Sequence, residues 1–125
     1  MSSWQEQTIS DVLFVDWGTL KEGHDAATNI VVKEGKSIEG VVLMIKDHPV
    51  FGHIYKIKSK EHEKQILVTG NKALNREMLG EGMKESETKG FTPIKVNDEI
   101  RITYNGMYQT ESGGKGYDLK VSVKR

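Results

Sequence analysis

The chain has 125 residues with 18 basic and 18 acidic side chains and no cysteine. This length is typical of one domain that buries a core without disulfides or a structural metal. The absence of cysteine excludes disulfides, thiolate nucleophiles and thiolate metal ligands; it suits a reducing compartment, so we expect the cytoplasm. No segment approaches the roughly 18 apolar residues that span a membrane, and a net charge of zero gives no whole-molecule attraction to a polyanion.

The charge is distributed unevenly along the chain. Residues 1–35 contain two basic and six acidic side chains, whereas residues 36–76 contain eight basic and four acidic ones. An electrostatic footprint for a polyanion can therefore form in the middle third, although the whole protein is neutral. The alternative is that these lysines belong to a solvated strand face.

The first 35 residues have the least regular pattern. DVLFVDWGTL, residues 11–20, is apolar enough to be an additional strand or a segment docked on the core, and KEGHDAATN, residues 21–29, reads as a loop. Trp17 is expected to pack against the rest of the protein because its neighbours are apolar. We treat residues 1–35 as an N-terminal extension and residues 36–125 as the main domain.

A curved strand and a turn open the main domain. SIEGVVLMIK, residues 37–46, is rich in β-branched residues, and the interior Gly40 indicates a bend or bulge. Pro49 ends this run, because proline lacks a backbone donor and restricts the residue before it. A hairpin turn is expected there.

The second strand, VFGHIYKIKSK at residues 50–60, alternates in character. Alternation places Phe51 and Tyr55 on one face and Lys56 and Lys58 on the other. The sequence does not decide which of the two faces is exposed.

The hydrophobic period changes after a third strand. KQILVTG, residues 64–70, reads as that strand and ends at a glycine. Asn71 is suited to cap a helix over residues 72–79, with Gly80 at its C-terminal cap. Two helical turns are too short to be stable alone, so the helix must be held by packing.

A polar connection over residues 80–97 leads to two more strands. DEIRITYNG (98–106) and GYDLKVSV (116–123) both alternate apolar with polar side chains. The intervening SGGKG supplies a hairpin turn. Tyr104 and Tyr117 follow the inward positions and are expected in the core.

The order of these elements predicts an all-β protein with one short helix. Three strands, a helix and two strands match the five-stranded OB-fold barrel (β-β-β-α-β-β), here preceded by an N-terminal extension. A generic antiparallel barrel or sandwich with a helical insertion is the rival. We favour the OB-fold because the helix falls between the third and fourth strands, as that fold requires.

Two stretches resemble the single-stranded DNA-binding proteins of bacteriophages. VNDEI followed by RITYNGMYQTESGGKGYDLKVSV is similar to their last hairpin, and KEGK leading into SIEGVV resembles their first barrel strand. The resemblance covers roughly residues 33–125. It implies an OB-fold protein that coats single-stranded DNA in phage replication or recombination, often as an oligomer, in the host cytoplasm.

Binding of a single strand calls for aromatic side chains that stack on bases and basic side chains that neutralise phosphates. The stacking candidates are Phe51, Tyr55 and Tyr108, and the phosphate candidates are Lys56, Lys58, Lys72, Arg101 and Lys115. Each has a structural alternative: the aromatic residues can be core, the lysines can be solvated, and Arg101 can form a cross-strand pair. Tyr55 and Lys56 cannot share one face of a flat strand, so only one set lines a groove unless the strand twists.

Catalysis is not expected. SGGKG lacks the spacing of a phosphate-binding loop, and the four histidines lack metal-ligand spacing. We therefore expect no enzymatic activity, cofactor, metal or small-molecule substrate. The competing hypothesis is an OB-fold structural or protein-interaction module of a phage assembly, which the zero net charge and the acidic N-terminal third favour.

Overall fold

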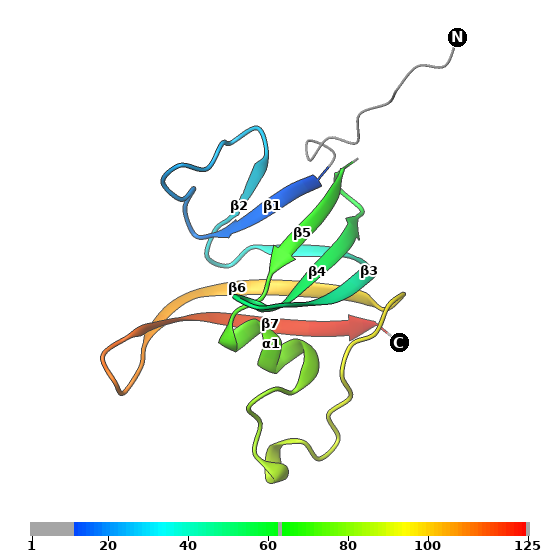
Figure 1. Ribbon diagram of the computed structural model, residues 1–125, viewed down its shortest axis with the longest axis vertical. Helices are drawn as coiled ribbons and strands as arrows, with labels where there is room; N and C mark the ends of the chain where they lie inside the picture. The colour runs from blue at the N-terminus through cyan, green and yellow to red at the C-terminus, as the bar shows by residue number, and fades with distance from the viewer. Residues whose placement is uncertain (1–11, 63, 125) are drawn as a thin grey trace.

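The computed structural model describes residues 12–62 and 64–124. This part is mostly β, with one short α-helix and one turn of 3-10 helix (Figure 1). The elements are β1 (Val12–Trp17), β2 (Asn29–Val32), β3 (Ser37–His48), β4 (Gly52–Ser59), β5 (Gln65–Thr69), α1 (Lys72–Leu79), η2 (Glu85–Glu87), β6 (Glu99–Gln109) and β7 (Lys115–Lys124). No helix in these two ranges is long and apolar enough to cross a membrane.

All seven strands belong to one sheet in the order β2-β1-β5-β4-β3-β6-β7. The sheet curls into a half-barrel, and Figure 1 shows β6 and β7 crossing beneath β4 and β5. The long strand β3 makes this curl possible because it pairs with β4 on one edge and, through its first five residues, with β6 on the other. The order β5-β4-β3-β6-β7, with a helix between β5 and β6, is consistent with an OB-like arrangement.

The strand number corrects the sequence prediction, since the described sheet has seven strands where five were expected. The two additional strands, β1 and β2, come from the N-terminal extension, which the sequence left open as a docked segment or a strand. β1 runs parallel to both β2 and β5. Such pairing joins segments that are distant in sequence, so no local turn motif announces it.

Gly40 and a bulge have separate roles in β3. A Cβ atom on Gly40 would lie 2.4 Å from the carbonyl oxygen of Lys58, so the glycine permits close approach of β4. The register shift lies further along, between Val42 and Met44. The predicted bulge therefore occurs in this strand, but two residues beyond the glycine.

The prediction of the helix is confirmed. The Asn71 side chain accepts a hydrogen bond from the backbone N–H of Leu74 at 2.8 Å, and Gly80 ends the helix in the left-handed conformation at φ 79°. Leu74 and Met78 are fully buried against the sheet. Packing of this apolar side holds a helix of only eight residues in place.

The core fills the concave inner face of the sheet. Its residues alternate along each strand with outward-facing ones. They are Val15, Trp17, Val32, Ile38, Val42, Tyr55, Ile57, Ile66, Val68, Leu74, Met78, Ile94, Ile100, Ile102, Tyr104 and Leu119. The expectation that Tyr104 is core is thus confirmed, whereas Tyr117 is only partly buried at the edge of this cluster.

Candidate functional site

The outer face of β3, β4 and β5 carries three lysines. On β4 the core residues Tyr55 and Ile57 alternate with Lys56 and Lys58, which face outward. The register places Lys46 of β3 opposite Ile54 on the same outer face. These lysines form no ion pair with any residue in the ranges 12–62 and 64–124, and β4 and β5 contain no acidic residue.

Half-buried apolar side chains lie between these lysines. Lys56 is opposite Met44 on β3 and Leu67 on β5, and Leu67 is in turn opposite Phe14 on β1. All three apolar residues are partly exposed and lie outside the core cluster. The outer face therefore combines accessible apolar surface with cations that have no ion pair in the described part of the chain, the composition that suits contacts with phosphates and bases together.

A cleft adjoins this face where β1 and β5 separate. The two strands pair only as far as Phe14 and Leu67. Beyond that point β1 continues with β2 to Trp17, while β5 continues with β4 to Thr69. The diverging ends bound an open cleft of about 780 Å³, which is within the usual size of ligand sites.

Four aromatic side chains from three parts of the chain line the cleft. They are Phe14 and Trp17 of β1, Phe51 of the turn between β3 and β4, and Tyr117 of β7. Trp17 and Tyr117 both pack against the buried Tyr104, with ring centroids 5.9 and 6.1 Å away. Much of the cleft wall is therefore apolar and is supported by the core.

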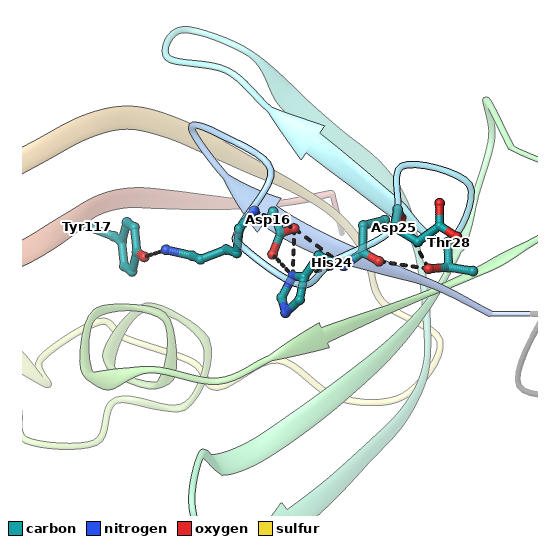
Figure 2. Close-up of polar contacts among 7 residues, drawn as sticks. Asp16, His24, Asp25, Thr28 and Tyr117 are labelled. Atoms are coloured by element: carbon teal, nitrogen blue, oxygen red, sulfur yellow. Dashed lines mark hydrogen bonds and ion pairs between the residues drawn. The ribbon is translucent and has the colours of Figure 1, made fainter.

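The polar part of the cleft is centred on Asp16, which is only 3% exposed. Its carboxylate accepts a hydrogen bond from Nδ1 of His24 at 2.8 Å, and others from the Lys21 backbone N–H and the Asn29 side chain at 3.3 and 3.4 Å (Figure 2). These donors compensate the burial of the charge. His24 is left with Nε2 directed away from Asp16.

Lys21 contributes a cation at the rim of the cleft. Its Nζ donates to the hydroxyl oxygen of Tyr117 at 2.7 Å and lies 5.4 Å from the ring centroid. The ammonium therefore lies at the end of the ring that carries the hydroxyl. The hydrogen bond to Tyr117 raises the pKa of Lys21, which keeps the side chain positively charged.

Four of the eight predicted site residues lie on the outer face, in the cleft or next to it. Lys56 and Lys58 lie on the outer face, and Phe51, 38% exposed, lies in the cleft. Lys72 is exposed at the first position of α1, next to Asn71, which also lines the cleft. The structure thus places Lys56 and Lys58 on the outer face, Phe51 in the cleft and Lys72 next to a residue that lines the cleft.

Tyr55 has to be removed from the predicted site. Its ring is fully buried, and its hydroxyl donates to Oδ1 of Asn75 at 2.7 Å. Burial raises the pKa of this tyrosine. No base can stack on it, because alternation turned the lysines of β4 outward and the aromatic ring inward.

Arg101 is separated from the cleft and is already paired. It bonds Glu39, its cross-strand partner, near the Ser59 end of β4, whereas Phe51 precedes the other end. An eight-residue strand puts roughly 25 Å between these ends. Arg101 fits the cross-strand alternative that the sequence left open.

The last two predicted residues lie on the hairpin of β6 and β7. Tyr108 is 51% exposed, and its ring covers Gly116, where an added Cβ would come within 2.7 Å of it. Lys115 is exposed opposite Gln109 at the first position of β7. Both lie beside the hairpin tip and do not line the cleft.

Several residues of the site were not singled out from the sequence. They are Phe14, Asp16, Lys21, His24 and Lys46, together with Tyr117, which was expected in the core. Lys46 carried a usable signal, because it falls in the basic middle third. The others gave none, since the cleft exists only through the parallel pairing of β1 with β5.

Comparisons with protein-family models, curated proteins and solved structures found no match for this chain. Within residues 12–62 and 64–124, no three His, Asp or Glu side chains are grouped so that they could hold a metal ion. The site is therefore interpreted from its own geometry.

Proposed function

We propose that this protein is a sequence-tolerant single-stranded DNA-binding protein of OB-fold type. The observation that carries the proposal is the outer face of β3 and β4, where Lys46, Lys56 and Lys58 lie without ion-pair partners in the described part of the chain. Unpaired cations can neutralise phosphates and release counterions, the main source of affinity for nucleic acid.

The arrangement of the strands supports the same proposal. In an OB-fold, nucleic acid binds on the second and third strands and on the two loops beside them. The corresponding elements here are β4 and β5, the turn that carries Phe51, and the hairpin tip near Tyr108 and Lys115. The three lysines and the cleft lie on or beside those elements.

The cations at the other end of the sheet differ from these lysines because they have acidic partners. There Arg101 is paired with Glu39, and both Lys60 and Lys124 are paired with Glu99, whose pKa is lowered by the hydrogen bond from Lys60. Cations that already have acidic partners have less to gain from a phosphate. A neutral protein can thus bind DNA through one face. The phage resemblance suggests that it does so in replication or recombination, as an oligomer.

Binding of fluorescein-labelled oligo-dT, followed by anisotropy over a range of salt concentrations, tests the proposal. K46Q/K56Q/K58Q should weaken binding at least tenfold and reduce the salt slope by about 2, as expected for three lost contacts with a single strand. The control K89Q/K95Q/K120Q removes as much charge from exposed lysines outside β3, β4 and β5. It should bind nearly as the parent does.

Two results would count against the proposal. Equal losses in the two triple variants would show that the outer face has no special role. An absence of binding at low salt, together with assembly that depends on protein concentration, would favour the protein-interaction alternative.

A further inference from the structure

The cleft between the ends of β1 and β5 is larger and less polar than contact with phosphates requires. Aromatic rings form much of its wall, and most of its polar groups already bond one another. A site with flat apolar walls and few free polar groups suits a planar heterocycle. The cleft adjoins the lysine face. Phe14 of β1 and Thr69 of β5 line the cleft, and both lie on the outer side of the sheet, the side that also carries the lysines.

We propose that this cleft receives one nucleotide of the bound strand, with its base against the aromatic walls and its phosphate at Lys21. The inference rests on the proposed function and deepens it, since it assigns a nucleotide-binding role to residues 12–32. Those residues lie outside the five strands and helix of the OB-like unit.

One wall is rigid before any ligand binds. Tyr117 packs edge-on against Tyr104 with an interplanar angle of 62°, and Tyr104 also contacts Trp17. Tyr104 and Trp17 are 4% and 6% exposed. Lys21 donates to the Tyr117 hydroxyl at 2.7 Å, so the ring is held both by the core and by a cation at the rim of the cleft.

Phe51 contributes a second aromatic surface from a turn that the core holds in place. Its carbonyl oxygen accepts a hydrogen bond from Nδ2 of Asn75 at 3.0 Å, and the neighbouring His53 carbonyl accepts one from Gly70 at 2.8 Å. Little ordering of the turn is then needed on binding, which favours affinity.

The polar groups fit a base without strong selection among bases. Asp16 and Asn29 are engaged with each other, and Asn29 also accepts from Thr28 at 2.8 Å. Among residues 12–62 and 64–124, His24 forms its hydrogen bonds through Nδ1, so Nε2 has no partner there, and the His24 side chain is 45% exposed. A ring nitrogen that can donate or accept gives little base discrimination, which agrees with sequence-tolerant binding.

Trp17 provides a direct probe of the cleft. The chain has two tryptophans, and Trp4→Phe leaves Trp17 as the sole one. Titration of this protein with oligo-dT should quench the Trp17 emission. Phe51→Ala should weaken oligo-dT binding about tenfold, as for loss of a stacking ring, whereas Val50→Ala, a change in the same turn at a more exposed residue outside the cleft, should have no effect.

Lys21 is tested in the same way. Lys21→Gln should weaken binding about threefold, and Lys33→Gln, at another exposed lysine outside the cleft, should not. Circular dichroism of each variant establishes that it is folded. Lys21 is exposed, so this second variant tests the cleft even if Phe51→Ala disturbs the turn.

The outcomes separate this inference from the proposed function. The protein could bind oligo-dT in a salt-dependent way while the Trp17 emission stays unchanged and Phe51→Ala and Val50→Ala bind with equal affinity. This result would overturn the cleft assignment and leave the role of the lysine face intact. Quenching by free dTMP without any oligo-dT binding would support a nucleotide site and overturn the strand-binding function. Failure of both ligands to bind or quench would overturn both proposals.

Discussion

Asn75 of α1 joins the core to the turn that carries Phe51. Its Oδ1 accepts from the buried Tyr55 hydroxyl at 2.7 Å, and its Nδ2 donates to the Phe51 carbonyl at 3.0 Å. One amide thereby satisfies a buried donor on β4 and an acceptor in the turn between β3 and β4. The same contact links the stability of the fold to the position of an aromatic residue in the cleft.

Asn75→Ala should therefore lower the free energy of unfolding by about 2–3 kcal/mol, because it leaves the Tyr55 hydroxyl and the Phe51 carbonyl without their partner. Urea denaturation measures the change. Lys72→Ala, at an exposed position of the same helix, should change stability by less than about 0.5 kcal/mol. A loss no greater in Asn75→Ala than in Lys72→Ala would contradict the linking role.

Gly40 should not tolerate a side chain. A Cβ there would lie 2.4 Å from the Lys58 carbonyl oxygen and 2.5 Å from Cγ2 of Ile57, so β3 and β4 would have to move apart. We expect Gly40→Ala to cost about 2–3 kcal/mol, the range of an overpacked site, measured by thermal denaturation. Gly114→Ala is the control, since its nearest neighbour is the Thr110 side chain at 3.3 Å. A Gly40→Ala protein as stable as the parent would refute the close approach of β3 and β4.

The Asp16 carboxylate should fix the tautomer of His24. A carboxylate that accepts from Nδ1 requires the proton of the neutral ring to be on that nitrogen. Imidazole ¹⁵N chemical shifts at pH 8 should therefore show Nδ1 protonated and Nε2 unprotonated. In Asp16→Ala the His24 signals should move toward those of a free imidazole, while the His62 signals stay constant. A His24 ring protonated on Nε2 in the parent protein would rule out the hydrogen bond from Nδ1 to Asp16.

Local features of the chain were predictable, and non-local ones were not. Asn71 and Gly80 delimit the helix by capping chemistry, which acts within a few residues. Alternation in β4 separated Tyr55 from Lys56 correctly, but it could not say which side faced water, because that depends on the strands packed beside it.

The cleft shows the same limit more clearly. It combines Asp16 and Lys21 with Phe51, Thr69 and Tyr117, residues that adjoin only after β1 pairs with β5 and the sheet curls. The loop between β1 and β2 contains Lys21 and His24. No spacing rule connects this loop to Tyr117, because Lys21 and Tyr117 are hydrogen-bonded in the structure but 96 residues apart in the sequence.

Arg101 and Lys56 should differ in their effect on DNA binding, although the sequence made both phosphate candidates. Arg101→Gln removes a cation that is already paired with Glu39, so the affinity for oligo-dT should change less than twofold. Lys56→Gln removes a cation without an ion pair in the described ranges and should weaken binding about threefold to tenfold at low salt. Anisotropy titrations compare the two, and a larger loss in Arg101→Gln would place the strand at the other end of the sheet.

Alkaline pH should destabilise the protein partly through Tyr55. Burial raises the pKa of this tyrosine above its ordinary value of 10, so the folded state keeps the phenol proton while the unfolded state releases it. The contribution of protonated Tyr55 to the free energy of unfolding is complete below pH 10. It is lost as the pH rises further, by up to about 1.4 kcal/mol for each pH unit.

Tyr55→Phe isolates this contribution, because phenylalanine cannot ionise in either state. The variant should be about 1 kcal/mol less stable than the parent at pH 7, where the hydroxyl donates to Asn75. Between pH 10 and 11.5 its free energy of unfolding should fall less steeply. Urea denaturation at half-unit pH intervals measures the pH dependence of the free energy of unfolding for both proteins. The raised pKa values of Lys21 and Tyr104 affect the two proteins equally. Parallel slopes would therefore mean that Tyr55 ionises as readily in the folded protein as in the unfolded chain.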